Sequence, residues 1–390
     1  MSLKPSGPSF NFIETHKIQR VLLVKLTSLG DVVHALPVAS SLKKAFPFLK
    51  LHWVVEDRCA PLLETHPLLD SVIIYPRQEL QSLISKRKWG QVLKCLKDLR
   101  RSLKDLHIDL SLDLQGLAKS GLMVLMTGAR HRIGCFGLKE ISYLISKSLP
   151  EGADLHAVDR NLKVAEFLGA GIEAPKFVFG FKDEEKAWAE EFLGKHKVSD
   201  EVRLVGLQVG ASFPQKCWPI QKMVVLAEKM SNFPNTRVIL FGDQNDRERL
   251  KPCLAQVPLT VINTLGELSL RQLMALIDRC QLFVGADTGP LHLAVGLGPK
   301  VIALCGADDP KWTGPYGYSH RIHYKKLSCS PCNKTPVCQG RYDCMESIEV
   351  DEVMDSVRDV FENSEFGVRS EKIKSEAGMR QKSFFLDSEF

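Results

Sequence analysis

The sequence predicts an α/β protein with two doubly wound, Rossmann-like domains, each built on a largely parallel sheet. Three observations lead to this prediction. Short apolar runs alternate with helical patterns over residues 21–169 and again over residues 204–304, a rhythm typical of βαβ units. A segment rich in Gly, Pro and Phe, residues 171–182, separates the two series and lacks a helical period. The length of 390 residues also favours two domains over one.

The first series of elements begins at residue 21. Strands are expected at the apolar runs 21–24, 51–55, 71–75, 110–113 and 132–133. Helices fit between them at 32–45, 61–65, 89–104 and 118–126, and a further helical pattern covers 155–169. This alternation favours a parallel sheet with helices on both faces.

The second series repeats the pattern. Strands are expected at 204–208, 238–241, 259–263, 282–285 and 301–304, with helices at 220–231, 246–255, 270–278 and 290–295. We therefore expect domains at 19–175 and 176–362, a flexible arm over 1–18 and a disordered polar tail over 363–390. Ligands should bind in the cleft between the domains, beyond the carboxyl ends of the strands.

The charge is modest overall but unevenly distributed. The formal net charge is +6, and we expect no nucleic-acid partner. Residues 86–104 hold eight Lys or Arg and one acid, Asp98, with Trp89 and several leucines between them. This is the pattern of a basic amphipathic helix. It is either a solvated helix face or a surface for anionic membrane lipid or an anionic acceptor.

The sequence also suggests a location in the cell. No apolar run approaches the roughly 18 residues that a membrane-spanning helix needs, and the first residues lack the apolar core of a signal peptide. Seven scattered cysteines fit a reducing compartment. We expect a cytoplasmic protein, peripheral on the cytoplasmic face of the inner membrane.

The most informative segment is VLLVKLTSLGDVVHAL at 21–36. An apolar strand runs into a turn with Gly30, and Asp31 and His34 follow at the start of a helix. This is not a dinucleotide fingerprint, because only one glycine is present. Asp31 lies where the helix dipole stabilises an anion, so it can accept a proton. Alternatively, Asp31 only caps the helix.

A second segment, FVGADTGPLHLAVGL at 283–297, predicts an anion site. A buried strand ends at Gly285, and Asp287, Thr288 and Gly289 form a turn into a helix with Pro290 near its first position. Free backbone N–H groups at this helix start can hold a diphosphate. The alternative is an ordinary capped helix.

A third segment in the same half, LQVGASFPQKCWP at 207–219, places Lys216 after a Gly/Ser loop. A lysine there can reach phosphate oxygens, although most lysines are simply solvated. FGDQND at 241–246 ends another strand, where Asp246 either binds ribose hydroxyls or caps the next helix.

The first half carries cations that we expect near Asp31. DLQGLAKS at 113–120 is another strand end that leads into a helix start. We predict that the cleft wall there, which binds an anionic acceptor, includes Lys25, His34, Lys119, Arg130 and Arg132. Alternatively, these single charges are only solvated at the rim.

Four cysteines lie close together in the sequence, at Cys329, Cys332, Cys338 and Cys344. This spacing suits structural Zn²⁺ or an iron–sulfur cluster. The second pair is not CxxC, so a cysteine-rich loop without metal is the alternative.

In this combination and order, the segments resemble glycosyltransferase family 9, the ADP-heptose:lipopolysaccharide heptosyltransferases of GT-B fold. The resemblance covers about residues 20–360, and includes DLQGLAKS, HAVDR, KCWP, FGDQND, ADTGPLH and the cysteine segment. KLTSLGDVVHALP and HAVDR look most like heptosyltransferase I. The cysteine segment looks more like the heptosyltransferase II branch.

The resemblance implies an inverting transfer of heptose from ADP-L-glycero-D-manno-heptose to a Kdo or heptose hydroxyl of the lipopolysaccharide inner core, without metal or another cofactor. Asp31 falls on the family's catalytic aspartate, and Lys216 on its phosphate-binding lysine. The family's donor-binding turn falls on Asp287, Thr288, Gly289 and His292. Ser212 keeps a hydroxyl expected in the donor loop, whereas Ala211 does not.

Three other functions stay open on the sequence. One is a transferase of the same fold that uses another nucleotide sugar. The second is a GT-B-fold sugar-nucleotide epimerase, which needs no lipid acceptor. The third is a non-catalytic nucleotide-sugar binding protein.

Overall fold

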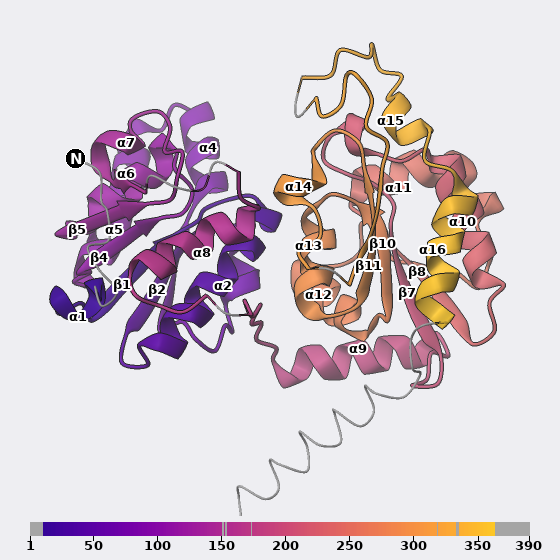
Figure 1. The fold of residues 1–390 in the computed structure, drawn as a ribbon, viewed down its shortest axis with the longest axis horizontal. Helices are drawn as coiled ribbons and strands as arrows, with labels where there is room; N and C mark the ends of the chain where they lie inside the picture. Colours follow the sequence, from indigo (N-terminus) through magenta and orange to yellow (C-terminus); the bar gives the residue numbers. More distant parts are fainter. Residues whose placement is uncertain are drawn as a thin grey trace, which may run out of the picture.

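The computed structural model describes residues 11–149, 152, 154–172, 174–317, 319–332 and 335–362. Two six-stranded sheets lie side by side, each with helices on both faces (Figure 1). Within the described residues all strand pairs are parallel, as in β1 with β2 and β7 with β8. The predicted fold class is confirmed. The tail predicted over 363–390 lies outside the described residues.

The first sheet has the strand order β3-β2-β1-β4-β5-β6. Its strands are β1 (Arg20–Val24), β2 (Lys50–Glu56), β3 (Ser71–Tyr75), β4 (Leu110–Asp113), β5 (His131–Gly134) and β6 (Lys147–Ser148). Its helices are α1 (Phe12–Thr15), α2 (Leu29–Ala45), α3 (Ala60–Leu63), α4 (Arg77–Ser85), α5 (Trp89–Asp105), α6 (Ala118–Thr127), α7 (Ser142–Ile145) and α8 (Ala157–Phe167). The strand order reverses between β1 and β4, which places a ligand crevice at their carboxyl ends.

The second sheet has the order β12-β11-β10-β7-β8-β9. Its strands are β7 (Arg203–Gln208), β8 (Thr236–Phe241), β9 (Ile262–Asn263), β10 (Leu282–Ala286), β11 (Lys300–Cys305) and β12 (Arg321–Tyr324). The helices are α9 (Asp183–Lys195), α10 (Ile220–Ser231), α11 (Gln244–Leu250), α12 (Leu270–Arg279), α13 (Gly289–Leu297), α14 (Pro310–Thr313), α15 (Asp343–Glu346) and α16 (Val350–Glu362). Here the order reverses between β10 and β7, so their carboxyl ends form the corresponding crevice.

The strands are apolar in sequence because both of their faces are buried. In β1, residues 21–24 are all fully buried, because helices cover both faces of a parallel sheet. Helix α2 is likewise apolar over most of its surface. It packs against α8 of its own domain and against α13 of the second domain, so α2 and α13 face each other where the domains meet (Figure 1).

A buried arginine also joins the domains. Arg271 of α12 donates to the Pro61 carbonyl at 3.1 Å and to Thr65 Oγ1 at 2.9 Å, both in the first domain. It also donates to the Gly180 carbonyl of the connecting segment at 2.8 Å. These contacts connect the second domain to the first domain and to the connecting segment. The domain boundary predicted at 175/176 falls between α8 and α9 and stays a prediction.

Some predicted elements differ from the structure. The flexible arm predicted over 1–18 is wrong for its last part, because α1 packs Phe12 and Ile13 into the core and Ile18 follows them there. A four-residue helix is too short to give a recognisable period. Helix α9 and edge strand β12 were not predicted. The strand predicted at 259–263 shortens to Ile262–Asn263.

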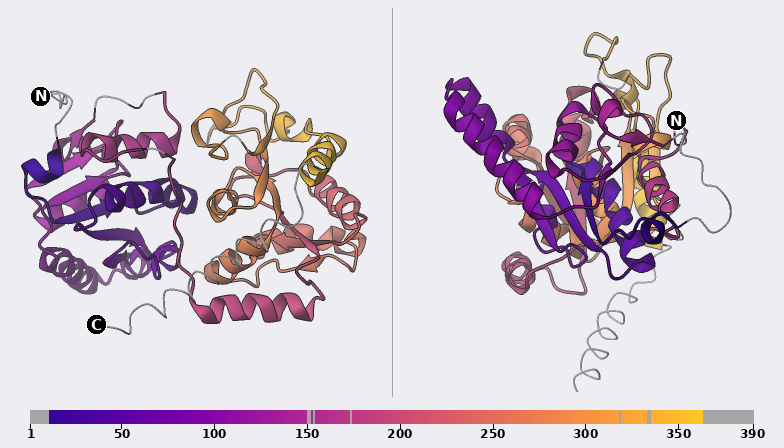
Figure 2. Two further views of the ribbon diagram at one scale, coloured as in Figure 1. Left: turned by 60° about the horizontal axis from the view of Figure 1, so that its bottom comes forward. Right: turned by 90° about the vertical axis from the view of Figure 1, so that its left-hand side faces the viewer.

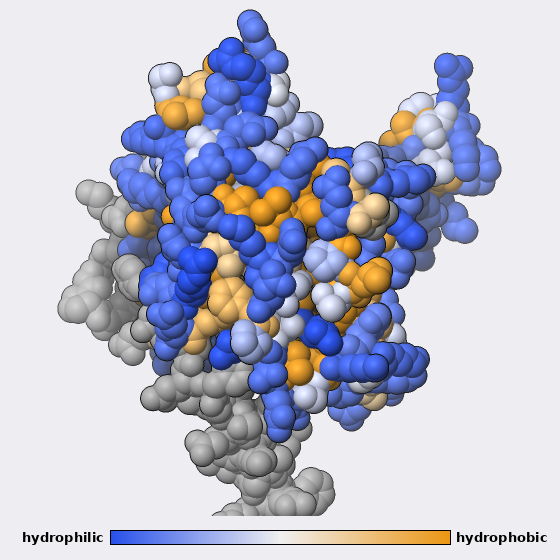
Figure 3. Space-filling view, turned by 90° about the vertical axis from the view of Figure 1, so that its right-hand side faces the viewer, coloured by the Kyte–Doolittle hydropathy of each residue, from blue (hydrophilic) through white to orange (hydrophobic). Residues whose placement is uncertain are grey.

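The outer surfaces of the two domains differ. In the right-hand view of Figure 2, α4 and α5 project from the first domain. The face of the second domain seen in Figure 3, which carries α10 and α16, is mostly hydrophilic with apolar side chains between the charged ones. Within the described ranges, no helix is long and apolar enough to cross a bilayer.

Candidate active site in the cleft

A pocket of roughly 550 Å³ lies where the two domains meet. Ser28, Leu29 and Gly30 line it from the start of α2. The second domain contributes residues from the carboxyl ends of three strands, which are Gln208, Gly210, Ser212, Lys216, Asp243, Asp246, Asp287, Thr288 and Gly289. All three predicted strand-end segments of the second domain therefore meet the predicted segment of the first.

Asp31 lies in the first turn of α2, directly after the pocket-lining residues. Its Oδ2 accepts hydrogen bonds from Ser28 N at 2.9 Å and Ser28 Oγ at 3.1 Å. Lys25 Nζ lies 3.8 Å from Oδ1, and 45% of the Asp31 side chain stays exposed. The carboxylate thus caps the helix and is also open to solvent, so the two roles weighed from the sequence are compatible.

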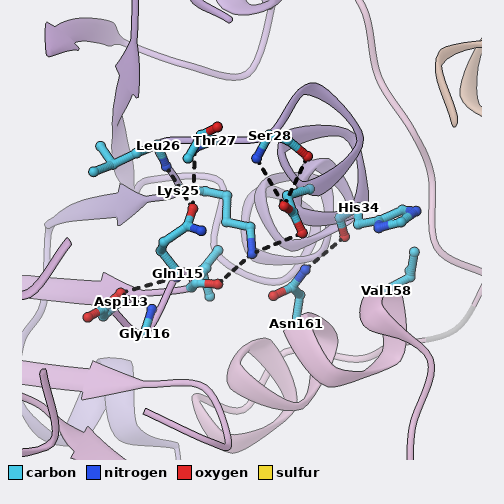
Figure 4. Close-up of polar contacts among 12 residues, drawn as sticks. Lys25, Leu26, Thr27, Ser28, His34, Asp113, Gln115, Gly116, Val158 and Asn161 are labelled. Atoms are coloured by element: carbon cyan, nitrogen blue, oxygen red, sulfur yellow. Dashed lines mark hydrogen bonds and ion pairs between the residues drawn. The ribbon is translucent and has the colours of Figure 1, made fainter. Parts of the chain in front are cut away.

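Lys25 is fixed beside Asp31 by a second contact. Its Nζ donates to the Leu114 carbonyl at 2.8 Å, and the side chain is buried (Figure 4). Gln115 Oε1 accepts from the backbone N–H groups of Leu26 and Thr27 and so supports the loop before α2. The DLQG segment after β4 therefore positions the loop that carries the carboxylate.

Lys216 supplies a positive charge to the pocket from the second domain. Its Nζ donates to the Asp287 carbonyl at 3.0 Å and lies 3.5 Å from Asp287 Oδ2. Asp308 forms a second ion pair with it. Burial alone would lower the pKa of Lys216, but the carboxylates of Asp287 and Asp308 outweigh it and raise the pKa. Lys216 is therefore charged at neutral pH.

The start of α13 lies against the start of α2. Thr288 is the extended N-cap residue, and a proline occupies the first turn. The first N–H groups of a helix have no partner within it. A Cβ on Gly289 would lie 2.9 Å from the Leu29 side chain. Only glycine permits this approach, which brings the free N–H groups to the pocket.

His292 connects the turn to the first domain. Its Nε2 lies 3.0 Å from Asp287 Oδ1, and its ring centroid lies 4.2 Å from that of His34. Burial would raise the pKa of Asp287, but His292, Lys216 and a hydrogen bond from Thr313 lower it below its ordinary value. Asp287 is therefore a buried carboxylate anion that contacts both Lys216 and His292.

His34 does not line the acceptor side of the cleft as predicted. Only 4% of it is exposed, and its ring packs between His292 and His156. The helix position three residues after Asp31 turns this side chain toward α13 instead of the open pocket.

Asp246 makes the contacts of a cap and also lines the pocket. Its Oδ2 accepts from Asp243 N at 3.1 Å, and its own N–H donates to Asp243 Oδ1 at 3.0 Å. Burial raises its pKa. Ser212 lies in the exposed loop over the pocket.

The predicted acceptor cations separate into two groups. Lys119 lies near the carboxyl end of the first sheet, where its Nζ is 2.9 Å from Glu56 Oε1. Arg130 and Arg132 do not line the cleft, so this prediction is wrong. In the register of the sheet, the neighbouring His131 of β5 pairs with Leu110 of β4. Leu110 in turn pairs with Val21, near the beginning of β1. The two arginines therefore lie at the amino-terminal edge of the sheet, opposite Asp31.

Two acidic residues of the site were missed from the sequence. Glu56 ends β2, is buried, and pairs with both Lys119 and Arg77. Asp308 follows β11 and pairs with Lys216. Each follows or ends an apolar strand at the carboxyl edge, which is the signal that could have identified them.

The four cysteines do not form the predicted metal site. The described part of the chain includes all four, and within it no three His, Cys, Asp or Glu side chains are grouped to hold an ion. Cys344 is buried against Gly306, while Cys329, Cys332 and Cys338 are partly exposed. Burial raises the pKa of the Cys344 thiol.

Two parallel sheets that face a common pocket are the architecture of the GT-B fold. The sequence model of glycosyltransferase family 9 (heptosyltransferase) matches residues 96–342. The chain belongs to this family and is a glycosyltransferase.

Individual relatives agree with this assignment. The chain is 29% identical over 324 residues to lipopolysaccharide heptosyltransferase 1 of Pseudomonas aeruginosa, covering 81% of this chain and 86% of that protein. The fold is similar to that of a family 9 glycosyltransferase from Veillonella parvula, with a TM-score of 0.78, 21% identity, and coverage of 92% of this chain and 100% of that chain. It is also similar to E. coli heptosyltransferase WaaC with ADP-2-deoxy-2-fluoro heptose, with a TM-score of 0.67, 22% identity, and coverage of 87% and 99%.

Proposed function

We propose that this enzyme transfers heptose from ADP-L-glycero-D-manno-heptose to a Kdo or heptose hydroxyl of the lipopolysaccharide inner core, with inversion at the anomeric carbon. The observation that carries the proposal is the meeting of two helix starts at one pocket. The α2 start brings Asp31, and the α13 start brings free N–H groups beside Lys216. The name of the Pseudomonas aeruginosa relative supports lipopolysaccharide as the acceptor class.

Asp31 is the proposed general base. An inverting transfer needs one base on the acceptor side, while the leaving group departs from the opposite face of the sugar. The contacts from Ser28 orient the carboxylate, and Lys25 places positive charge at 3.8 Å from it. With almost half of its side chain exposed, Asp31 can reach an acceptor hydroxyl.

Lys216 and the α13 start stabilise the leaving ADP. Negative charge develops on the diphosphate as the glycosidic bond breaks, and preorganised cations and N–H groups lower the energy of that state. The ion pairs with Asp287 and Asp308 hold Lys216 in place before the donor binds. Because Lys216 and the N–H groups of α13 can stabilise the negative charge of the diphosphate, we propose that the transfer needs no metal ion.

The acceptor approaches along the first domain. Lys25 and Lys119 lie near the carboxyl edge of its sheet, where they can bind acceptor carboxylates or phosphates. Asp246 and Ser212, which line the opposite side, are proposed contacts for the donor nucleotide.

A membrane-facing surface on the first domain supports a lipid-linked acceptor. We define the α5–α7 surface by its exposed apolar side chains, which are Trp89, Leu93, Leu122, Leu125, Ile141, Tyr143 and Leu144. Helices α5, α6 and α7 pack side by side, and exposed Lys and Arg residues of 86–104 border the apolar ones. Apolar and basic side chains together favour anionic lipid. We propose that the enzyme is peripheral on the cytoplasmic face of the inner membrane.

A donor panel tests the proposal. Nucleoside diphosphate release is measured with ADP-heptose, ADP-glucose and UDP-N-acetylglucosamine, each with and without Kdo₂-lipid A. We expect release with ADP-heptose only, and only when the acceptor is present. Release from another donor would indicate a different transferase, and turnover of the sugar nucleotide without acceptor would indicate an epimerase.

A further inference from the structure

Arg130 and Arg132, which do not line the cleft, line a separate pocket. This pocket, of roughly 600 Å³, lies at the amino-terminal edge of the first sheet. Its walls come from α1, the start of β5, β6 and the end of α8. Asp31 and the cleft lie beyond the opposite edge, so the two sites share no residue.

Cations dominate the lining of this pocket. Arg130, Arg132 and Lys147 all line it, and no Asp or Glu does. Within the described ranges, none of the three forms an ion pair, in contrast to Lys25, Lys119 and Lys216 of the cleft. Three cationic side chains without a carboxylate partner favour the binding of a multiply charged anion.

Among the described residues, the nearby carboxylate of Asp109 forms no ion pair with these three cations. Its Oδ2 accepts from the backbone N–H groups of Gln19 and Arg20, both at 2.9 Å. Asp109 is thereby held at the chain entry to β1, and it is not among the residues that line the pocket.

Aromatic rings give the pocket a fixed wall. Phe12 stacks on His16 at 4.1 Å between centroids, and His16 meets His131 edge-on at 4.7 Å. Phe167 packs against Phe12 at 5.8 Å. The pKa of His131 is lowered by burial first and then by His16, Arg130 and Lys147, against the opposing charge of Asp109. The site thus combines cations with rigid apolar surface and with ring N–H groups.

We propose that this pocket binds a ligand with a phosphoryl group, whose oxygens contact Arg130, Arg132 and Lys147 while an attached apolar or ring portion lies against Phe12 and Phe167. The inference goes beyond the transferase activity, because no donor or acceptor group needs to enter this edge of the sheet. The phosphoryl group can belong to a soluble metabolite or to a lipid headgroup.

Pyrophosphate is the probe for the first test, which uses the full-length chain with Lys216→Ala to weaken binding in the cleft. Titration calorimetry then compares Arg130→Ser/Arg132→Ser with Arg341→Ser/Arg358→Ser, which removes the same charge from exposed positions of the second domain. We expect the pocket pair to raise the Kd about tenfold or more, and the control pair to change it less than about twofold. Equal effects of the two pairs would overturn the proposal.

Hydrogen exchange locates the binding independently of substitutions. Pyrophosphate should slow exchange in residues 11–16 and 129–133 of the unmodified chain, and no slowing there would also contradict the site. If the arginine pair does not fold, the single exposed substitution Lys147→Ser replaces it, with Lys104→Ser as its control.

A vesicle assay identifies the source of the phosphoryl group. Binding to phosphatidic acid vesicles that depends on Arg130 and Arg132 identifies a lipid headgroup, and pair-dependent binding of pyrophosphate alone identifies a soluble ligand. Independence from the pair in both assays rejects the pocket. None of these measurements uses ADP-heptose, so the result does not depend on the proposed transfer reaction.

Discussion

The imidazole rings of His34 and His292 meet edge-on across the domain boundary, with their centroids 4.2 Å apart. His292 also lies 3.0 Å from the carboxylate that binds Lys216, since Asp287 contacts both. The turn at 287–289, the proposed donor-binding turn, is therefore packed directly onto the helix that carries Asp31. Any relative movement of the domains must change this contact.

The buried His34 predicts a pH dependence of stability. Its pKa lies well below the ordinary value because of burial first, and then because of His292, His156 and Lys25. Below about pH 6.5 the unfolded chain binds a proton that the folded chain does not, so stability falls as the pH falls, by up to about 1.4 kcal/mol per pH unit.

We expect His34→Phe to reduce this loss between pH 6.5 and pH 5. Urea unfolding at several pH values measures it. The exposed His107→Asn serves as a control and should leave the pH dependence unchanged. A pH dependence that stays as steep in His34→Phe as in the wild type would contradict the assignment.

Lys216→Met should weaken the donor side. The substitution keeps much of the side-chain volume but removes the charge, and it leaves the buried carboxylate of Asp287 and the partly exposed carboxylate of Asp308 without their shared cation. We expect kcat/KM for ADP-heptose to fall about 100-fold or more. Lys229→Met, at an exposed ion pair of α10, is the matched control. Unchanged kinetics of Lys216→Met would remove this residue from the site.

Two substitutions test the α5–α7 surface. Trp89 and Leu144 are 59% and 73% exposed, so their replacement by Ser should not unfold the chain. Binding to vesicles with anionic lipid should weaken about tenfold or more in the double variant, because two apolar side chains no longer insert. Leu259→Ser, at an exposed apolar position of the second domain, should bind as the wild type does. Equal binding by all three proteins would reject the surface.

Removal of metal ions tests the proposed role of Lys216 and α13. Because the lysine and helix N–H groups are proposed to stabilise the diphosphate, treatment with EDTA should change kcat by less than about twofold. Loss of activity that returns with added Mg²⁺ would show that a metal ion takes this role.

The sequence predicted those parts of the fold and site that depend on local order along the chain. The strand, glycine turn and helix start around Asp31 and around Thr288 are local patterns, and both appear as expected. Short α1 and edge strand β12 were missed, because four residues carry too little periodicity.

Positions that depend on packing between elements were harder to predict. Arg130 was expected in the cleft together with the other cations of the first half, but it precedes β5 and so lies at the opposite edge of the sheet. His34 was placed at the acceptor because it follows Asp31, yet α13 covers it. Glu56 and Asp308 could only be linked to Lys119 and Lys216 once the strand order was known.

The central claim, that Asp31 is the base of an acceptor-dependent heptosyl transfer, is tested most directly by one comparison. ADP release from ADP-heptose with Kdo₂-lipid A is measured for the wild type and for Asp31→Asn, whose amide oxygen can still accept from Ser28 N. We predict a rate lower by about 100-fold or more in the variant, with ADP affinity within about twofold. A variant that keeps the wild-type rate, or that loses ADP binding, would contradict the account.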